Sequence, residues 1–544
     1  MISFNLRTMT FSVSVREERL KRIGRYFEKH IYFFLVTVLS AVSVFAFLYY
    51  MDNGLGLSYN DARSHLDIGR RVVEGLKPGL AQLGSVWLPL PHILMIPTIW
   101  NDFMWHSGLS GAIQSMASFV ITGILITLFL KELGVGLLGR IIGVLVFVLN
   151  INILYMQSTA MTELLLIATM TGGAYYLLRW HKYDHALDLI KASFFVMLAT
   201  LIRYDGWFLF LLGGGLVILK SFLKQGYKAA EGKALFYATL AGFGIVLWLL
   251  WNLLIFKDPL YFVFGPYAAY AQQTQLESAG VLQTKYNAPL SALIYLYALA
   301  YNSNAFYLIL AMIGAAVLAF DKKLSSWTKV GISLLFGPLI FNILALYLGH
   351  SVLFIQGFSG NTWFNVRYGI MMMPSIAIFI GFLVHKAKEL KYVVIGLLFL
   401  TAFFTFANGD AVTIDDARVG SSQKNVTQVS GWLNKNAKDK EGFVLISAAS
   451  HDAIIFSSGL SMKKFIHEGT GTYWESATTS PDRWARWIIM RTNDDNDLTF
   501  RSVKKTTGFK KYEKVESFPF ADIYEIRPEY LSQLETKAVL PKQK

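Results

Sequence analysis

Long apolar runs separated by short polar loops recur along most of this sequence, and they restrict the chain to a helical fold that crosses a membrane many times. About 20 apolar residues suffice for one helical span. About eleven such runs are predicted, near residues 31–50, 110–130, 134–156, 160–180, 188–202, 206–222, 234–256, 303–320, 328–349, 367–386 and 391–407. The charged fraction agrees, since it is 16% here and about 25% in soluble domains.

The basic residues orient the predicted bundle. They precede the first span and then recur in every second short loop, as Arg7, Arg16, Arg19, Lys21, Arg22, Arg25, Lys29, Arg179, Lys182, Lys191, Lys220, Lys224, Lys228, Lys233, Lys322, Lys323, Lys329, Lys386, Lys388 and Lys391. Because cytoplasmic loops carry the excess of Lys and Arg, the N-terminus is predicted to be cytoplasmic. The net charge of +14 therefore reflects topology, and no nucleic-acid partner is expected.

The composition becomes that of a soluble domain from about Asn408 onwards. A helix is predicted at Thr427–Asn434, and strands at Phe443–Ser447, Lys464–His467, Trp487–Met490 and Ala521–Ile526. We therefore expect a basic cytoplasmic segment 1–30, a transmembrane domain 31–407 with a long first outer loop 51–109, and a small extracytoplasmic α/β domain 408–544. The chain has no cysteine, which excludes disulfides, thiolate nucleophiles and Cys-ligated metals.

Charged residues from distant segments converge on the predicted outer face. The first outer loop holds Asp61, Arg63 and His65, and its segment Asp67–Val73 is predicted to lie on the membrane with Arg70 and Arg71 facing headgroups. The later outer turns hold Glu163, Arg203, Asp205 and Arg367. Ionisable residues at a membrane boundary usually line a water-filled cavity or a reaction site.

Each of these residues also has a purely structural interpretation. Glu163 could cap a helix, Arg203 and Asp205 could pair locally, and Arg367 could reach lipid headgroups. Their convergence favours a site, because a carboxylate can deprotonate a nucleophile and a guanidinium matches phosphate geometry. Asp61, His65 and Glu163 could hold a divalent cation if folding brings them together. Metal dependence therefore stays open.

Four short segments carry a resemblance to a known superfamily. They are Asn60-Asp61, Met161-Thr162-Glu163, the run Leu201–Trp207 that contains Arg203-Tyr204-Asp205, and Asn365-Val366-Arg367-Tyr368. In these segments the chain resembles the GT-C superfamily of integral membrane glycosyltransferases. It is most similar to the branch with protein O-mannosyltransferases and lipid A aminoarabinose transferases.

The resemblance implies transfer of a sugar from a polyprenyl-phosphate donor to a protein, lipid or glycan acceptor at the extracytoplasmic face. By this resemblance Asp61 is the catalytic base and Glu163 a second catalytic acid. Arg367 and Arg203 hold the donor phosphate, and His65, Asp205 and Arg63 support them. The chain departs from the family where Ala62 follows Asp61 and where Tyr473-Trp474-Glu475 does not match the Trp-Trp-Asp-Tyr-Gly signature of oligosaccharyltransferases. Transfer to asparagine is thus disfavoured.

Two other classes of function stay open. A secondary transporter or flippase is expected to show internal repeats and paired broken helices near the middle of the membrane. The sequence shows no repeat, and its charges gather at one face. A receptor or assembly factor would use the C-terminal domain, in which His451-Asp452 and His467-Glu468 are typical loop or strand residues.

Overall fold

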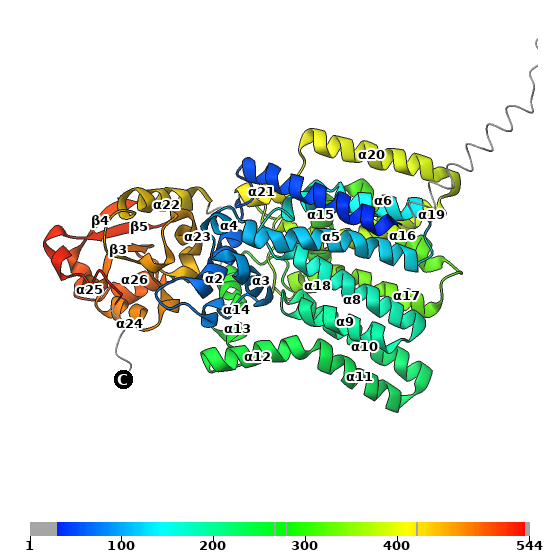
Figure 1. Cartoon of the computed structure of the whole chain (residues 1–544), viewed down its shortest axis with the longest axis horizontal. Helices are drawn as coiled ribbons and strands as arrows, with labels where there is room; N and C mark the ends of the chain where they lie inside the picture. The colour runs from blue at the N-terminus through cyan, green and yellow to red at the C-terminus, as the bar shows by residue number, and fades with distance from the viewer. Residues whose placement is uncertain (1–29, 266–267, 279, 420–422, 539–544) are drawn as a thin grey trace, which may run out of the picture.

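The computed structural model describes residues 30–265, 268–278, 280–419 and 423–538. The predicted basic segment 1–30 lies outside the described residues except for His30. A helical bundle fills most of the molecule, and a five-stranded sheet with its own helices lies at one end (Figure 1). The bundle helices are His30–Asp52, α5 Leu109–Glu132, α6 Leu137–Val148, α7 Ile151–Met156, α8 Glu163–Tyr183, α9 Ala186–Thr200, α10 Asp205–Gln225, α11 Tyr227–Ala241, α12 Phe243–Phe256, α15 Ala288–Ser303, α16 Ala305–Phe320, α17 Ser326–Ile332, α18 Gly337–Tyr347, η3 Val366–Met372, α19 Met373–Lys386 and α20 Lys391–Asn408.

The prediction of a polytopic helical membrane protein is confirmed. In the described part of the chain, six helices are long and apolar enough to cross a membrane, or up to eight if each of two bent pairs is one span. Helices α11 and α12 meet at 49°, and α15 and α16 at 108°. All eleven predicted runs are largely helical, but three do not form a long apolar helix.

These three exceptions have physical causes. The run 134–156 is divided at Asn150, whose side chain accepts a hydrogen bond from the backbone of Ile153 and so starts α7. Helix α8 is 21 residues long, but it carries polar side chains and is buried along most of its length. Helix α9 has only 15 residues. Helices packed inside a protein need neither the length nor the apolar surface that lipid demands.

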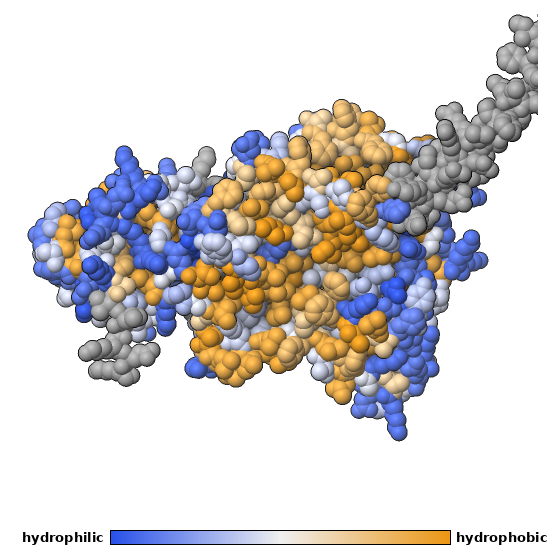
Figure 2. Space-filling view, viewed as in Figure 1, coloured by the Kyte–Doolittle hydropathy of each residue, from blue (hydrophilic) through white to orange (hydrophobic). Residues whose placement is uncertain are grey.

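The surface of the bundle is apolar where a membrane would contact it. Figure 2 shows a broad hydrophobic area over the bundle, between hydrophilic surfaces on the sheet and at the opposite edge. Helix α20 contributes strongly. Only 11% of the most apolar part of the helical stretch Lys388–Arg418, which contains it, is buried inside the protein, and Phe403 is 66% exposed. A surface of this kind would be unstable in water over such an area.

The sheet has the strand order β2-β1-β3-β5-β4. Strands β2, β1 and β3 are parallel, whereas β5 is antiparallel to β3 and β4. The strands are β1 Phe443–Leu445, β2 Phe465–Ile466, β3 Ala485–Met490, β4 Tyr512–Ser517 and β5 Asp522–Ile526, and the nearby helices are α21 Val412–Val419, α22 Gln423–Ala437, α23 Ala448–Ser458, α24 Thr472–Thr479, α25 Pro481–Trp484 and α26 Leu498–Val503. Strand β4 was not predicted, because this edge strand is mostly exposed and its sequence lacks an apolar pattern.

Helix α2 (Asn60–Val73) joins the bundle to the sheet-bearing part, because it packs on both α3 (Leu90–Ile99) and α23. The other loop helices are α4 Asp102–His106, α13 Tyr261–Phe264 and α14 Ala269–Ser278. The prediction that Arg70 and Arg71 face headgroups is wrong. Arg70 Nη2 lies 2.6 Å from Asp102 Oδ1, and Arg71 Nη1 lies 3.1 Å from Asp452 Oδ1. Both arginines are used to fasten α2 to neighbouring protein segments.

Candidate functional site

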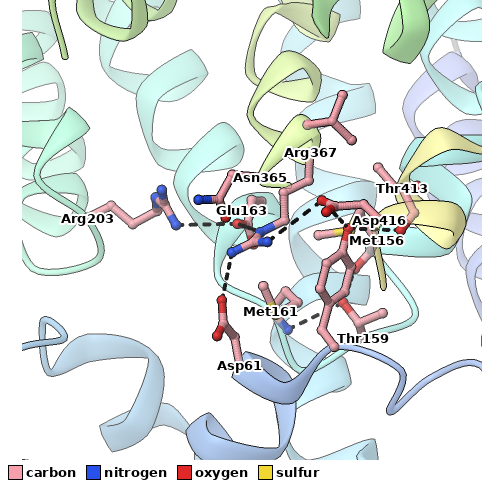
Figure 3. Close-up of polar contacts among 12 residues, drawn as sticks. Asp61, Met156, Thr159, Met161, Glu163, Arg203, Asn365, Arg367, Thr413 and Asp416 are labelled. Atoms are coloured by element: carbon pink, nitrogen blue, oxygen red, sulfur yellow. Dashed lines mark hydrogen bonds and ion pairs between the residues drawn. The ribbon is translucent and has the colours of Figure 1, made fainter. Parts of the chain in front are cut away.

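The two acids predicted to be catalytic both lie in the first turn of a helix. Asp61 is the second residue of α2, and Glu163 is the first residue of α8. Helix N-termini carry unpaired backbone N–H groups and favour negative charge there. The local sequence therefore places each carboxylate at the start of a helix, and Figure 3 shows both side chains beside the guanidinium of Arg367.

Arg367 connects these two acids. Its Nη2 lies 2.7 Å from Asp61 Oδ2, and its Nε lies 3.1 Å from Glu163 Oε1. Arg367 lies two residues after Asn365, whose φ is 54°. This is the left-handed region, which Asn tolerates better than most residues. Only 7% of the Arg367 side chain is exposed. A buried guanidinium is stable only when it is paired in this way.

Arg203 extends the cluster from the opposite side of Glu163. Its Nη1 lies 3.3 Å from Glu163 Oε1, and its Nε lies 3.4 Å from Asp205 Oδ2. The ring of Tyr368 contacts both guanidinium groups, with its centre 4.9 Å from Arg203 and 5.3 Å from Arg367. The folded chain thus brings together Asp61, Glu163, Asp205, Arg203 and Arg367, as Figure 3 shows for four of them.

The two acids differ in their access to solvent. The side chain of Glu163 is 0% exposed, whereas that of Asp61 is 44% exposed. Glu163 Oε1 accepts hydrogen bonds from both arginines, so this carboxylate is held in place. Asp61 is held through one oxygen and faces outward. Of the two, Asp61 is the one that an incoming molecule can reach.

Two further residues of the cluster were missed by sequence reasoning. Asp416 in α21 places Oδ2 3.9 Å from Arg367 Nη1. The hydroxyl of Tyr59 lies 3.1 Å from that same Oδ2 and 2.9 Å from the carbonyl oxygen of Thr413. A weak signal existed in the acidic pair Asp415-Asp416, directly after the last apolar run. Only Asp416 is on the buried face of its helix, together with Val412 four residues earlier.

Two of the predicted supporting residues contact other groups. His65 Nδ1 lies 2.9 Å from His92 Nε2, and its ring centre is 4.3 Å from that of Trp87. Burial, together with Arg203 and Arg367, lowers the pKa of His65 to about 3, so this imidazole is neutral at physiological pH. Arg63 donates to the Leu57 carbonyl at 2.9 Å and to Ser457 Oγ at 3.1 Å, which ties α2 to α23.

The geometry also bears on the question of a cation. His65 is bonded to His92, and the guanidinium of Arg367 lies between Asp61 and Glu163. Among the described residues there is no group of three or more His, Cys, Asp or Glu side chains arranged to hold a metal ion. The positive charge that these two carboxylates face is therefore that of an arginine.

The arrangement offers a partly exposed carboxylate beside a buried guanidinium. Four carboxylates, from Asp61, Glu163, Asp205 and Asp416, surround the guanidinium groups of Arg203 and Arg367. The Nη1 of Arg367 lies beyond hydrogen-bond distance of Asp416. An anionic ligand that displaces one carboxylate could make a two-point contact with this guanidinium. The displaced carboxylate would then lie next to the bound anion.

Comparison with known proteins identifies a solved structure with the same fold. No protein-family model matches the chain, and no curated protein matches its sequence. Among solved structures, ArnT from Cupriavidus metallidurans bound to undecaprenyl phosphate matches with a TM-score of 0.54 and 9% identity, over 91% of this chain and 98% of that chain. The archaeal oligosaccharyltransferase AglB from Archaeoglobus fulgidus, in complex with an inhibitory peptide and a dolichol-phosphate, matches with a TM-score of 0.46 and 11% identity, over 85% and 70%.

The likeness to ArnT extends over almost the whole of both chains. At 9% identity it establishes a shared fold. The resemblance predicted from the sequence is thus confirmed as a fold shared with this ArnT structure, and the expectation of a helical membrane part with a small C-terminal sheet is confirmed as well.

Proposed function

We propose that this chain is a membrane glycosyltransferase that moves a sugar from a polyprenyl-phosphate donor to a protein, lipid or glycan acceptor. The observation that carries this proposal is the position of Arg367, a buried guanidinium paired with both Asp61 and Glu163. It places a phosphate-binding group and a partly exposed base within one contact of each other. The ArnT structure with the same fold contains undecaprenyl phosphate, which supports this class of donor.

Each residue of the site has a separate role in the proposed reaction. Asp61 accepts the proton of the acceptor hydroxyl while the hydroxyl oxygen attacks the anomeric carbon of the sugar. The bond from that carbon to the phosphate oxygen breaks, and the electron pair leaves with the carrier phosphate. Attack opposite the leaving group inverts the anomeric carbon. Arg367 and Arg203 stabilise the charge that develops on the phosphate, and Glu163 holds both arginines in position.

Donor binding requires a rearrangement of one contact. Arg367 Nη2 lies 2.7 Å from Asp61 Oδ2, so a phosphate that uses this edge of the guanidinium replaces Asp61. The release of Asp61 from its arginine leaves the carboxylate available to the acceptor hydroxyl. The donor is therefore expected to bind before the acceptor can react.

We further propose the orientation that the basic loops predict. In this orientation the chain is a multi-pass protein of the cell membrane, and its segment 1–30 lies in the cytoplasm. The first loop 51–109 and the C-terminal domain 408–544 lie on the extracytoplasmic side. Protease added to intact cells with a permeabilised outer barrier should remove residues after about Asn408. Protection of that segment until the inner membrane is opened would reverse the proposed orientation.

Transport is the competing proposal, and two observations favour it. Helices α11 and α12 are bent by 49° at their junction, and α15 and α16 by 108°, and bent or broken helices are a feature of transporters. The purified protein should therefore be reconstituted in liposomes with labelled polyprenyl-phosphate sugars and a membrane extract as acceptor. Transfer of label from the donor to another molecule supports the enzyme. Movement of intact donor across the bilayer without any transfer contradicts it.

A further inference from the structure

A helix that follows the last span brings a third carboxylate to Arg367. Each nitrogen of this guanidinium faces a different acid: Nε faces Glu163 at 3.1 Å, Nη2 faces Asp61 at 2.7 Å and Nη1 faces Asp416 at 3.9 Å. Asp416 is only 3% exposed. An acid buried beside an arginine that is already paired twice is costly unless it contributes something else. This excess of negative charge requires an explanation.

The position of Asp416 is fixed by contacts with the bundle. Thr413 donates to Asn152 Oδ1 through its backbone N at 3.0 Å and through its hydroxyl at 2.8 Å. Asn152 is itself held, because its Nδ2 donates to the Asn302 carbonyl at 3.1 Å. The Tyr59 hydroxyl lies within hydrogen-bond distance of both Thr413 and Asp416. Helix α21 is thus fastened to α7 and to the residue that precedes α2.

Tyr59 also contacts the arginine directly. The guanidinium carbon of Arg367 lies 4.9 Å from the centre of the Tyr59 ring. The ring therefore contacts Arg367 while the hydroxyl of the same side chain meets Asp416. Because a cation is attracted to an aromatic ring, this contact holds Arg367 when a ligand displaces Asp61.

We propose that Asp416 is a positioning residue of the site, which holds Arg367 together with Tyr59 and limits how tightly the carrier phosphate binds. This inference rests on the proposed glycosyl transfer. A negative charge 3.9 Å from Arg367 Nη1 opposes an incoming phosphate and keeps the guanidinium in place. The released carrier phosphate is one of the two products, and over-tight binding of a product slows turnover. Asp416 therefore favours product release.

The test compares two adjacent acids in the same helix. Asp416→Asn removes the buried charge but keeps an oxygen for Tyr59, whereas Asp415→Asn changes an exposed neighbour. Binding of a polyprenyl phosphate to the detergent-solubilised protein should become about tenfold tighter in Asp416→Asn and stay unchanged in Asp415→Asn. In transfer assays Asp416→Asn should lower both kcat and the KM for donor, and Asp416→Glu should restore part of the parental behaviour.

The outcomes separate this inference from the proposed function. If Asp416→Asn binds the carrier phosphate no more tightly than Asp415→Asn, the inference is wrong, even if the parental protein transfers sugar. If Asp416→Asn binds it more tightly but the parental protein transfers none, the phosphate site stands and the transfer fails.

A second variant leaves the buried charge in place and keeps the test decisive if Asp416→Asn does not fold. Tyr59→Phe removes only the hydroxyl that meets Asp416 and Thr413. If Asp416→Asn does not fold, Tyr59→Phe should still change both kcat and carrier-phosphate binding relative to Asp415→Asn. If neither kcat nor carrier-phosphate binding changes in Tyr59→Phe, the positioning role is wrong.

Discussion

The two ends of the bundle use charged residues differently. Helix α8 connects them, since Glu163 begins it and Tyr183 ends it, and 21 helical residues span about 30 Å. At the far end Asp184 lies 3.2 Å from Lys220 Nζ and 3.0 Å from Lys233 Nζ. At the sheet-bearing end Glu163 is paired with Arg203 and Arg367. Both ends hold an acid between two cations.

The differences lie in the type of cation, the burial of the acid and the distance in sequence between the partners. The Asp184 side chain is 32% exposed, and its lysines are 36 and 49 residues away in sequence. The Glu163 side chain is 0% exposed, and Arg367 is 204 residues away from it and 306 from Asp61. Lysines near a membrane surface fix topology. Arginines gathered from distant segments suit the two-point recognition of a phosphate or a carboxylate.

The largest expected difference between the ends concerns catalysis. Asp61→Asn should reduce sugar transfer by about 10²–10⁴-fold, because the amide cannot accept the proton of the acceptor. Asp184→Asn is the matched control at the other end, since Asp184 has a φ of 61° and Asn tolerates the left-handed region well. Transfer by Asp184→Asn should equal the parental rate. Parental transfer by Asp61→Asn would remove the catalytic distinction between the ends.

Donor binding should separate the two types of cation. Arg367→Ala should weaken donor affinity more than tenfold, because a charge-assisted contact is worth about 1.5–3 kcal/mol. Arg367→Lys should restore only part of it, since lysine cannot make the planar two-point contact. Lys233→Ala, at the far end, should leave affinity unchanged. Equal donor affinity in all four proteins, measured on the detergent-solubilised chain, would reduce Arg367 to a structural residue.

Glu163 should show a mixed effect on transfer and on stability. Glu163→Gln should impair transfer less than Asp61→Asn, because this acid positions the arginines and does not meet the acceptor. It should also destabilise the fold by roughly 1.5–3 kcal/mol, since it weakens the hydrogen bonds that the buried carboxylate accepts from both guanidinium groups. Thermal unfolding and transfer, measured on the same preparation, check both effects. A variant with parental stability would contradict the central position of Glu163.

A smaller effect is expected where α2 meets α23. Burial, and then the charge of Asp452, raise the pKa of Asp67 well above its usual range, and burial raises the pKa of Asp452 to about 6. The folded state thus retains protons that the unfolded state releases near pH 4. Stability should therefore fall as the pH rises above about 4, first through about 6 as Asp452 loses its proton and then further as Asp67 loses its own. Asp67→Asn should flatten this dependence of Tm on pH. An unchanged profile would exclude the pair as its source.

The site residues that could be predicted from the sequence are those whose charge differs from an apolar surrounding sequence. Asp61, Glu163, Arg203 and Arg367 stand out because they interrupt or border apolar runs, where charges are costly. Asp416 lies where the sequence is already rich in charges, so the acidic pair Asp415-Asp416 gives only a weak signal. The partner of His65 could not be predicted either, since nothing in the sequence indicates that His92 lies beside it.

The same reasoning explains what the sequence revealed of the fold. The apolar runs predicted the helices well, because a bilayer demands both length and hydrophobicity. Helix α8 is covered by other helices along most of its length, and there the rule on an apolar surface does not apply. The edge strand β4 was missed because its exposed side chains carry no apolar pattern.

A structure of the chain bound to a polyprenyl phosphate would show whether the carrier phosphate takes the place of Asp61 on Arg367. We expect a phosphate oxygen within hydrogen-bond distance of Arg367, and an Asp61 carboxylate that has moved away from Nη2, which now lies 2.7 Å from it. A phosphate bound elsewhere, with the ion pair between Asp61 and Arg367 intact, would contradict this expectation.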